Sequence, residues 1–323
     1  MTSIRLLLLA TLLIAAVPAA HVRAQEATRE DEPEALKLEN IELRAPCVTL
    51  SEDGTYYLTG TTNINTLDPR YADFQNNDGI RLWKSQDLKT WESVGLVWDL
   101  SKTGGRDASK SGWQAHLRSV PDDPDRPWSR GVTAPELHRV KDAWYMIFAL
   151  NDQDIGLLKS KTGKPEGPYE EIGRMSNRFL GGDGSLFEDT DGTVYMVWGA
   201  GYIAPMKGDM SDIAEEPRAL QMTIRGYPEE MPLANQRGER GAFIFHDGGK
   251  YHFVYSAWNL RDGQGHFDAV VCEAPVLHGP YSRPRLLATD VQRQAMLLRS
   301  ANGAVMTMFS RGDKPVIMPF ARR

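Results

Sequence analysis

A short unit recurs five times along this chain of 323 residues: a tight turn followed by an aromatic or aliphatic strand. The copies span 52–58, 141–147, 190–196, 248–253 and 301–306, and four of them carry glycine in the turn. Glycine adopts positive φ at little cost, so Asx-Gly pairs favour hairpins. Counted from positions 54, 143, 192, 249 and 303, the intervals are 89, 49, 57 and 54 residues. A four-stranded propeller blade takes about 40–50 residues, so the repeat predicts an all-β, five-bladed β-propeller.

A second feature follows three of these units at a similar place. It reads 85–91 after the first copy, 164–169 after the second and 278–281 after the fourth. We interpret these segments as connections to the outer strand of each blade. The long first interval predicts an insertion, which we place in the Gly-, Asp- and Pro-rich segment Ser101–Pro127. The alternative is that turn-and-strand units recur by chance, as they do in any β protein.

The N-terminus has the layout of a secretory signal peptide. Arg5 precedes the apolar stretch Leu6–Ala20, and Val22-Arg23-Ala24 forms a small-x-small cleavage signal. A membrane anchor is the alternative, but this run of 15 residues is short against the roughly 20 that a membrane span needs. We therefore expect a signal peptide over 1–24, a disordered leader over 25–37 and one propeller domain over 38–323. The mature protein is then secreted or periplasmic and free of the membrane.

Charge and cysteine content narrow the partners. The net charge is -6 and no basic cluster stands out, which disfavours nucleic acid and suits a neutral ligand bound by a monomer. Cys47 and Cys272 are the two cysteines. Export permits a disulfide between them, but two buried free thiols fit equally, and their spacing is not that of a metal site.

Three segments together resemble glycoside hydrolase family 43 and its five-bladed relatives, over roughly Ile41 to Pro319. The strongest is 181–192, where Asp183-Gly184 precedes an apolar strand and a D-x-D-G hairpin. Ala134-Pro135-Glu136 is similar to the family's second-blade A-P-[DE] start, and 79–91 also matches. Each segment alone is a weak signal, but the combination is fairly specific.

The resemblance implies a reaction and three carboxylates. Enzymes of that family hydrolyse arabinofuranosides or xylosides with inversion, using a base Asp, a tuning Asp and an acid Glu on the innermost strands. Inversion needs the acid and base about 6.5–9.5 Å apart, with water between. Asp183 matches the tuning Asp, although a turn role beside Gly184 is the alternative. Glu239 matches the general acid, but Arg240 stands between it and Gly241 and the usual Pro is absent.

The base is missing from the expected place. Where the family has Asp-Pro before its first strand, this chain has Ala45-Pro46. Glu136 and Asp78 are the possible substitutes, although each also fits a structural or substrate-contact role. Before the last innermost strand the family often has Gly-His near a central ion or water, whereas this chain has Gln294. We expect no cofactor, and a structural calcium on the propeller axis stays open.

Substrate contacts are expected from aromatic residues in loops and at strand ends, because aromatic faces stack on sugar C–H faces. The candidates are Trp113, Trp128 and Trp258, together with Arg44 beside Ala45. Packing between blades is the alternative for each tryptophan. Three functions remain open at this point: an exported glycoside hydrolase with an altered base, a degenerate propeller that binds carbohydrate without cleaving it, and a propeller that binds a non-sugar partner.

Overall fold

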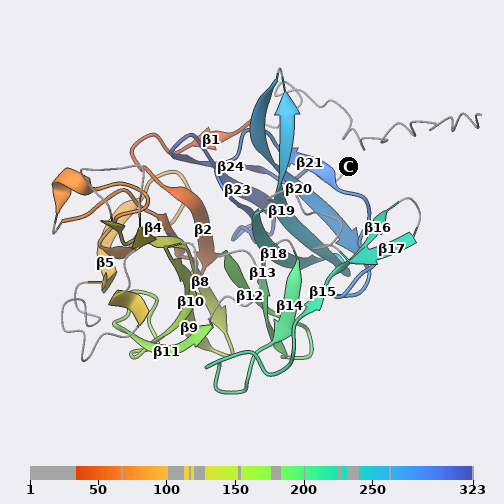
Figure 1. Ribbon diagram of the computed structural model, residues 1–323, viewed down its shortest axis with the longest axis horizontal. Coiled ribbons are helices and arrows are strands. Elements are labelled where there is room, and N and C mark those ends of the chain that lie inside the picture. The colour runs from red at the N-terminus through yellow and green to blue at the C-terminus, as the bar shows by residue number, and fades with distance from the viewer. Residues whose placement is uncertain are drawn as a thin grey trace, which may run out of the picture.

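The computed structural model describes residues 34–66, 68–100, 113–115, 118–119, 128–151, 154–175, 183–199, 201–224, 227–230, 240–261 and 263–321. Within them the chain forms five antiparallel four-stranded sheets around a common centre (Figure 1). The innermost strands touch in succession, and the last lies against the first, so the ring closes. The predicted all-β, five-bladed β-propeller is confirmed.

Each blade runs from an innermost to an outermost strand. Blade one contains β2 (Arg44–Leu50), β3 (Tyr56–Thr61), β4 (Gly79–Ser85) and β5 (Glu92–Asp99). Blade two contains β8 (Val132–Val140), β9 (Ala143–Leu150), β10 (Asp154–Ser160) and β11 (Tyr169–Met175). Blade three contains β12 (Gly184–Glu188), β13 (Val194–Trp198), β14 (Tyr202–Pro205) and β15 (Arg218–Ala219). Blade four contains β18 (Arg240–Asp247), β19 (Lys250–Arg261), β20 (Gln264–Ala274) and β21 (Arg285–Ala288).

Blade five joins the two ends of the chain. It contains β22 (Ala295–Arg299), β23 (Val305–Arg311), β24 (Lys314–Pro319) and, as its outermost strand, β1 (Leu36–Lys37). Leu36 pairs with Ile317 and Lys37 with Val316, and β1 lies beside β24 in Figure 1. The fold thus includes two residues before the boundary expected at 38. This pairing ties the start of the ring to its end.

The five recurring turns all join the innermost strand of a blade to the second strand. Blades one, three and five use one turn, in which Gly54, Gly192 and Gly303 have φ of 85°, 81° and 84°. Each of these glycines donates its N–H to the carbonyl three residues earlier. The weakest copy in the sequence, 301–306, therefore folds like the strongest. Positive φ at these sites explains why glycine recurs there.

The three matching segments after the repeats join third to fourth strands, as expected from the sequence. In blades two and four they share a contact, in which a buried tyrosine hydroxyl reaches back four residues. Tyr169 Oη donates to Pro165 O at 2.5 Å, and Tyr281 Oη donates to Leu277 O at 2.7 Å. The same local sequence thus produces the same corner in both blades.

The core lies between the blades, where neighbouring sheets pack face to face. Strands covered on both faces become nearly continuous apolar runs, as in β9, where seven of the eight residues of Ala143–Leu150 are buried. Cys47 and Cys272 belong to different apolar clusters and are both free and buried. The alternative of two free thiols is therefore the correct one.

The described residues add to the ring the hairpin β16 (Gln221–Ile224) with β17 (Tyr227–Glu230), the pair β6 (Arg118–Ser119) with β7 (Trp128–Ser129), and two 3₁₀ turns, η2 (Pro69–Tyr71) and η4 (Trp113–Ala115). The predicted signal peptide and the glycines at 181 and 182 lie outside the described residues, as does most of the predicted insertion. No helix in the described part of the chain is long and apolar enough to cross a bilayer.

Candidate active site

The N-terminal ends of the innermost strands meet at one end of the propeller axis, which we call the funnel. Four contacts between blades establish this. Ala134 N donates to Thr61 Oγ1 at 2.8 Å, linking blades two and one. Gln294 Nε2 donates to Glu136 Oε1, linking blades five and two. Asp183 pairs with Arg293 across blades three and five, and Gly241 of blade four packs against Gln294.

Three innermost strands begin with the same β-bulge. Between two paired positions the innermost strand has one residue more than its partner strand. This extra residue occurs between Arg44 and Cys47, between Thr133 and Glu136, and between Arg240 and Phe243. The residue after the first has positive φ in each case: 47° at Ala45, 45° at Ala134 and 71° at Gly241. Bulges of this kind re-aim side chains and are frequent beside active sites.

The bulge makes Ala45, Ala134 and Gly241 equivalent positions at the mouth of the ring. Alanine pays for positive φ, whereas Asp and Asn adopt it several-fold more readily than other residues with a side chain. The Ala45 backbone thus has a conformation that suits an aspartate, although the residue itself is a fully buried alanine. The replacement of the family's base Asp by Ala45 stays a prediction, because Ala134 has the same backbone conformation.

Glu136 lies at the axis and is held on both oxygens. Besides the Gln294 bond on Oε1, His138 Nε2 contacts Oε2 at 2.7 Å. Only 1 % of the residue is exposed. A buried carboxylate is tolerated when it is paired and hydrogen-bonded. Because contacts occupy both of its oxygens, Glu136 links blades two and five, and this disfavours it as the substitute base.

Asp183 is the buried carboxylate at the funnel end of blade three. It directly precedes β12, is 5 % exposed, and its Oδ1 lies 3.6 Å from Arg293 Nη1. Arg293 has a φ of 74° and directly precedes Gln294. The cation of blade five thus faces the Asp183 carboxylate. Sequence reasoning singled out Gln294 and missed Arg293, whose only signal was its place beside Gln294.

Asp78, the other possible base, lies in the connection between β3 and β4. Its Oδ2 accepts bonds from Thr66 N, Thr66 Oγ1 and Arg81 Nη2, at 3.0, 2.7 and 2.7 Å. Its Oδ1 has no hydrogen-bond partner among the described residues, although the side chain is 1 % exposed. Among these residues the Asp78 carboxylate is therefore anchored through Oδ2 alone.

Glu239 lies outside the described residues, which resume at Arg240. Within them, Arg240 directly precedes the bulge glycine Gly241, just as Arg44 precedes Ala45. In the family's pattern a Glu directly precedes this glycine, whereas here Arg240 occupies that position. Arg240 itself is exposed at the entrance of β18.

The expected substrate contacts divide between core and rim. For Trp113 the structure favours the packing alternative, because its indole is buried, stacks on the Phe148 ring with centroids 5.8 Å apart and donates to Glu171 Oε1 at 2.6 Å. The sequence could not show that Trp113 packs onto blade two. Arg44 donates to Asp313 Oδ1 at 2.6 Å and covers the Phe74 ring at 4.1 Å, so it fixes the rim between blades one and five.

The remaining two tryptophans are Trp128 and Trp258. Trp128 begins β7, and its side chain lies outside the described part of the structure. Trp258 lies in β19 and is 43 % exposed. Trp258 is therefore the expected sugar contact that the structure leaves accessible.

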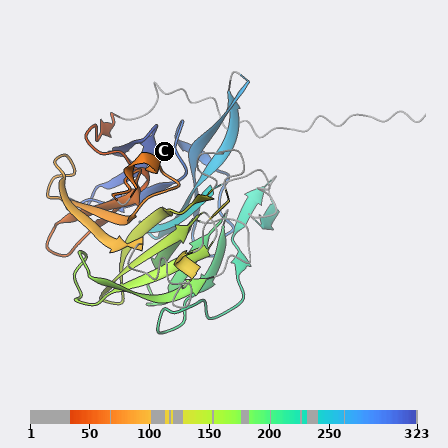
Figure 2. The same cartoon turned by 60° about the vertical axis from the view of Figure 1, so that its left-hand side comes forward.

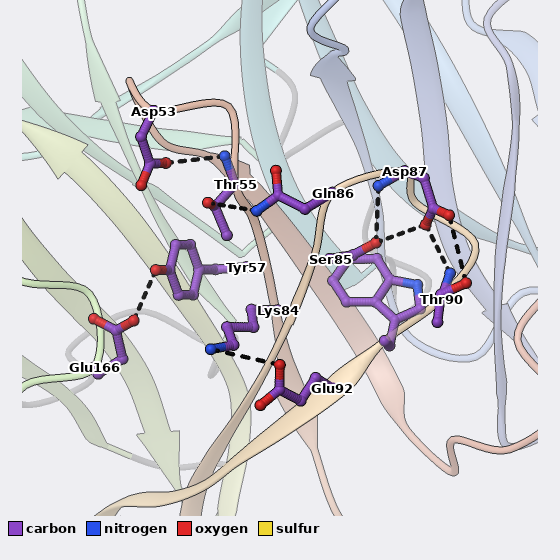
Figure 3. A pocket seen from close by; sticks show the side chains of 11 residues that line it. Asp53, Thr55, Tyr57, Lys84, Ser85, Gln86, Asp87, Thr90, Glu92 and Glu166 are labelled. Carbon is purple, nitrogen blue, oxygen red and sulfur yellow. Dashed lines mark hydrogen bonds and ion pairs between the residues drawn. The ribbon is translucent and has the colours of Figure 1, made fainter.

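A separate groove of about 740 Å³ lies at the other end of the strands, between the turn of blade one and the outer connections of blades one and two. Figure 3 shows that its polar groups satisfy one another. Tyr57 Oη donates to Glu166 Oε1 at 2.8 Å, Lys84 pairs with Glu92 at 3.5 Å, and the Asp87 carboxylate caps Lys89 N and Thr90 N. The polar side chains of the groove are thus engaged with one another, and the groove lies away from the carboxylates of the funnel.

Metal binding was left open for the axis. In the described ranges no three His, Cys, Asp or Glu side chains come together as an ion-binding group. The axial position instead carries the Gln294–Glu136–His138 chain of contacts.

Comparison with known proteins agrees with the fold. A β-D-galactofuranosidase, xynD, of Aspergillus niger is 24 % identical over 251 residues, covering 69 % of this chain and 68 % of its own. An endo-arabinase from Bacteroides thetaiotaomicron superposes with a TM-score of 0.62 at 18 % identity, covering 89 % of this chain and 97 % of its own. An endo-1,4-β-xylanase from the same organism gives 0.58 at 18 % identity, covering 90 % and 94 %.

These structural neighbours share the fold at identities that establish the architecture alone. The family described as glycosyl hydrolases family 43 matches residues 41–306, which is most of the chain and spans the start of the ring to β23. The match includes all five innermost strands and every contact that forms the funnel. The chain belongs to glycoside hydrolase family 43.

Proposed function

We propose that this chain is an exported, inverting glycoside hydrolase acting on arabinofuranoside- or xyloside-like bonds of plant- or algal-type oligosaccharides and polysaccharides. The observation that carries the proposal is the buried Asp183 at the funnel end of β12, facing Arg293. Removing both charges of this pair from water costs several kcal/mol per ion, so a buried ion pair is weak evidence of stabilisation and packing alone gives little reason to place the Asp183–Arg293 pair there.

The roles follow from the chemistry of inversion. A general acid protonates the leaving oxygen while a base activates water on the opposite face of the sugar. In this proposal Glu239 is the acid, and the negative charge of Asp183 keeps it protonated until it acts. Asp78 is the better substitute base of the two considered, because Glu136 is held on both oxygens while Asp78 Oδ1 is not.

The substrate class rests on the relatives. A galactofuranosidase, an endo-arabinase and an endo-xylanase share the family or the fold, and all three names refer to cleavage of sugars at O-glycosidic bonds. The net charge of -6 agrees with a neutral oligosaccharide rather than an anionic one.

The test uses nitrophenyl arabinofuranosides, xylosides and galactosides, followed by plant and algal oligosaccharides. Proton NMR during turnover reports the anomer released first, which is the inverted one in this proposal. Glu239→Gln removes the acid and lowers the rate by about 10²–10⁴-fold. Retention of configuration, or full activity of Glu239→Gln, contradicts the assignment.

A second function, carbohydrate binding without cleavage, is favoured by two specific observations. Ala45 cannot accept a proton, and Arg240 stands in the register where the pattern has the acid. Saturable binding without turnover, unaffected by Ala45→Asp, supports this alternative. Appearance of activity in Ala45→Asp instead identifies a decayed enzyme.

Export rests on the N-terminal sequence. The apolar segment Leu6–Ala20 and the Val22-Arg23-Ala24 signal support cleavage before Gln25. Mass spectrometry of the protein recovered outside the cytoplasm is expected to show Gln25 as the first residue. An uncleaved chain held in the membrane fraction contradicts this proposal.

A further inference from the structure

Among the residues that the structure describes, β19 and β20 form the hairpin with the longest strands. These strands have 12 and 11 residues, whereas the innermost strands of the five blades have five to nine. The hairpin rises beyond the rest of the molecule in both views (Figures 1 and 2). Because β18 starts at the funnel and β19 returns antiparallel to it, the tip of the hairpin stands on the funnel side.

Trp258 is displayed on this hairpin in a fixed position. Its indole is 43 % exposed and meets the Phe267 ring edge-on, with centroids 4.9 Å apart. It also lies directly over Gly265, where an added Cβ would fall 1.8 Å from Trp258 Cζ2. No side chain fits beneath the ring, so glycine at 265 is a condition of this indole position. A single exposed apolar residue is ordinary, but here the glycine directly beneath the indole fixes where the exposed ring lies.

The hairpin is tied to the segment that leads into the funnel. Val291 N donates to Phe267 O at 2.9 Å, and Asp290 N donates to Asp268 Oδ1 at 3.1 Å. His266 Nδ1 lies 2.9 Å from Asp290 Oδ1. Two residues after Val291 the same segment reaches Arg293, which faces Asp183. The indole is thus held at a defined place relative to the proposed catalytic centre.

We propose that Trp258 is a stacking platform for a sugar ring outside the catalytic subsite, so that the ligand is a chain of several sugar units running from the funnel over the β19–β20 hairpin. An indole offers a flat apolar face to sugar C–H groups. Gly265 is the positioning residue that keeps this face presented. The inference rests on the proposed function only in taking carbohydrate as the ligand.

The test measures binding by isothermal titration with arabino- and xylo-oligosaccharides of two and six units. Trp258→Ala is expected to weaken binding of the six-unit chain about tenfold, as expected for loss of one stacked ring, and to weaken the two-unit chain much less. Trp258→Phe retains part of the affinity. The matched control is Val276→Ala, which removes an exposed apolar side chain from the opposite end of the same blade and leaves binding unchanged.

Gly265→Ala tests the close packing of the Trp258 indole on residue 265. It keeps the tryptophan but displaces the indole, so it is expected to lower affinity for the six-unit chain and to shift tryptophan emission on titration. Six-unit binding within twofold of wild type in Trp258→Ala overturns the inference, as does an equal loss for both chain lengths or no saturable binding at all. Self-association that Trp258→Ala abolishes, with sugar binding intact, assigns the surface to a second copy instead.

The binding readout separates this inference from the proposed function. Sugar binding that depends on Trp258, without hydrolysis of any aryl glycoside, supports the platform and contradicts the enzyme. Hydrolysis of aryl glycosides without any chain-length effect of Trp258→Ala contradicts the platform and supports the enzyme.

Discussion

Replacing Gly241 by alanine tests whether the bulge of blade four closes the ring as described. The backbone there has a φ of 71°, and the added Cβ would lie 2.6 Å from Gln294 Cβ. Left-handed backbone costs a residue with a side chain about 1–2 kcal/mol. Displacing Gln294 also strains its bond to the Glu136 carboxylate, and a bond to a charged group contributes about 1.5–3 kcal/mol. We therefore expect Gly241→Ala to lower the free energy of unfolding by about 2–4 kcal/mol.

The matched control is Gly54→Ala, at a φ of 85° with nothing within 4 Å of the added Cβ. It carries the backbone cost alone, about 1–2 kcal/mol. In a domain of this size each kcal/mol lowers the melting temperature by about 2 °C, so calorimetry should separate the variants by several degrees. Equal melting temperatures for Gly241→Ala and Gly54→Ala would refute the close contact between blades four and five.

Three further outcomes follow from the same contacts. Ala45→Asp fits the local φ of 47°, but with Asp78 acting as the base it is expected to change kcat on aryl glycosides by less than about tenfold; a gain of about 10²–10⁴-fold identifies residue 45 as an unfilled base position and contradicts Asp78 as the base. Burial raises the pKa of the Cys47 and Cys272 thiols, so iodoacetamide at pH 8 should leave both unmodified in the folded protein by mass spectrometry, and rapid labelling of either contradicts their burial. Burial lowers the pKa of His252 below its ordinary 6.5, so the unfolded state binds the proton more readily and stability falls as pH drops below about 6.5. His252→Gln should flatten the decline in melting temperature from pH 7 to 5, and an unaltered decline contradicts this role.

The blades were predictable because their turns are local. Asp53-Gly54, Asp191-Gly192 and Asn302-Gly303 specify a hairpin through the φ of one glycine, whatever lies elsewhere in the chain. The repeat interval then fixes the number of blades. The pairing of Leu36 with Ile317 left no such mark, because two residues of an edge strand carry no periodic signal.

The funnel was predictable only at the level of residue type. Asp183 and Glu136 were identified, and both are buried, Asp183 directly before β12 and Glu136 in the middle of β8. Their partners were not, since His138 and Arg293 come close only when separate blades converge or a strand fixes a side chain. The packing of Trp113 was out of reach for the same reason: its stacking partner Phe148 is 35 positions along the chain and on a different element.

The identical bulges at Ala45, Ala134 and Gly241 were also out of reach of the sequence. Alanine gives no hint of positive φ, and only the register of the partner strands shows that the three positions are equivalent. That equivalence places Ala45 and Gly241 at the funnel mouth.

The most direct test of the central claim compares two aspartates at opposite ends of β12. Asp183 lies at the funnel end, and Asp189 lies at the far turn, where its carboxylate accepts the Tyr251 hydroxyl at 2.8 Å. Kinetics on the best nitrophenyl glycoside are measured for Asp183→Asn and Asp189→Asn, each checked for folding by its melting temperature. A hydrolytic site in the funnel predicts that Asp183→Asn loses at least about 100-fold in kcat/KM, while Asp189→Asn stays within twofold of wild type. Equal activity of the two folded variants would contradict it.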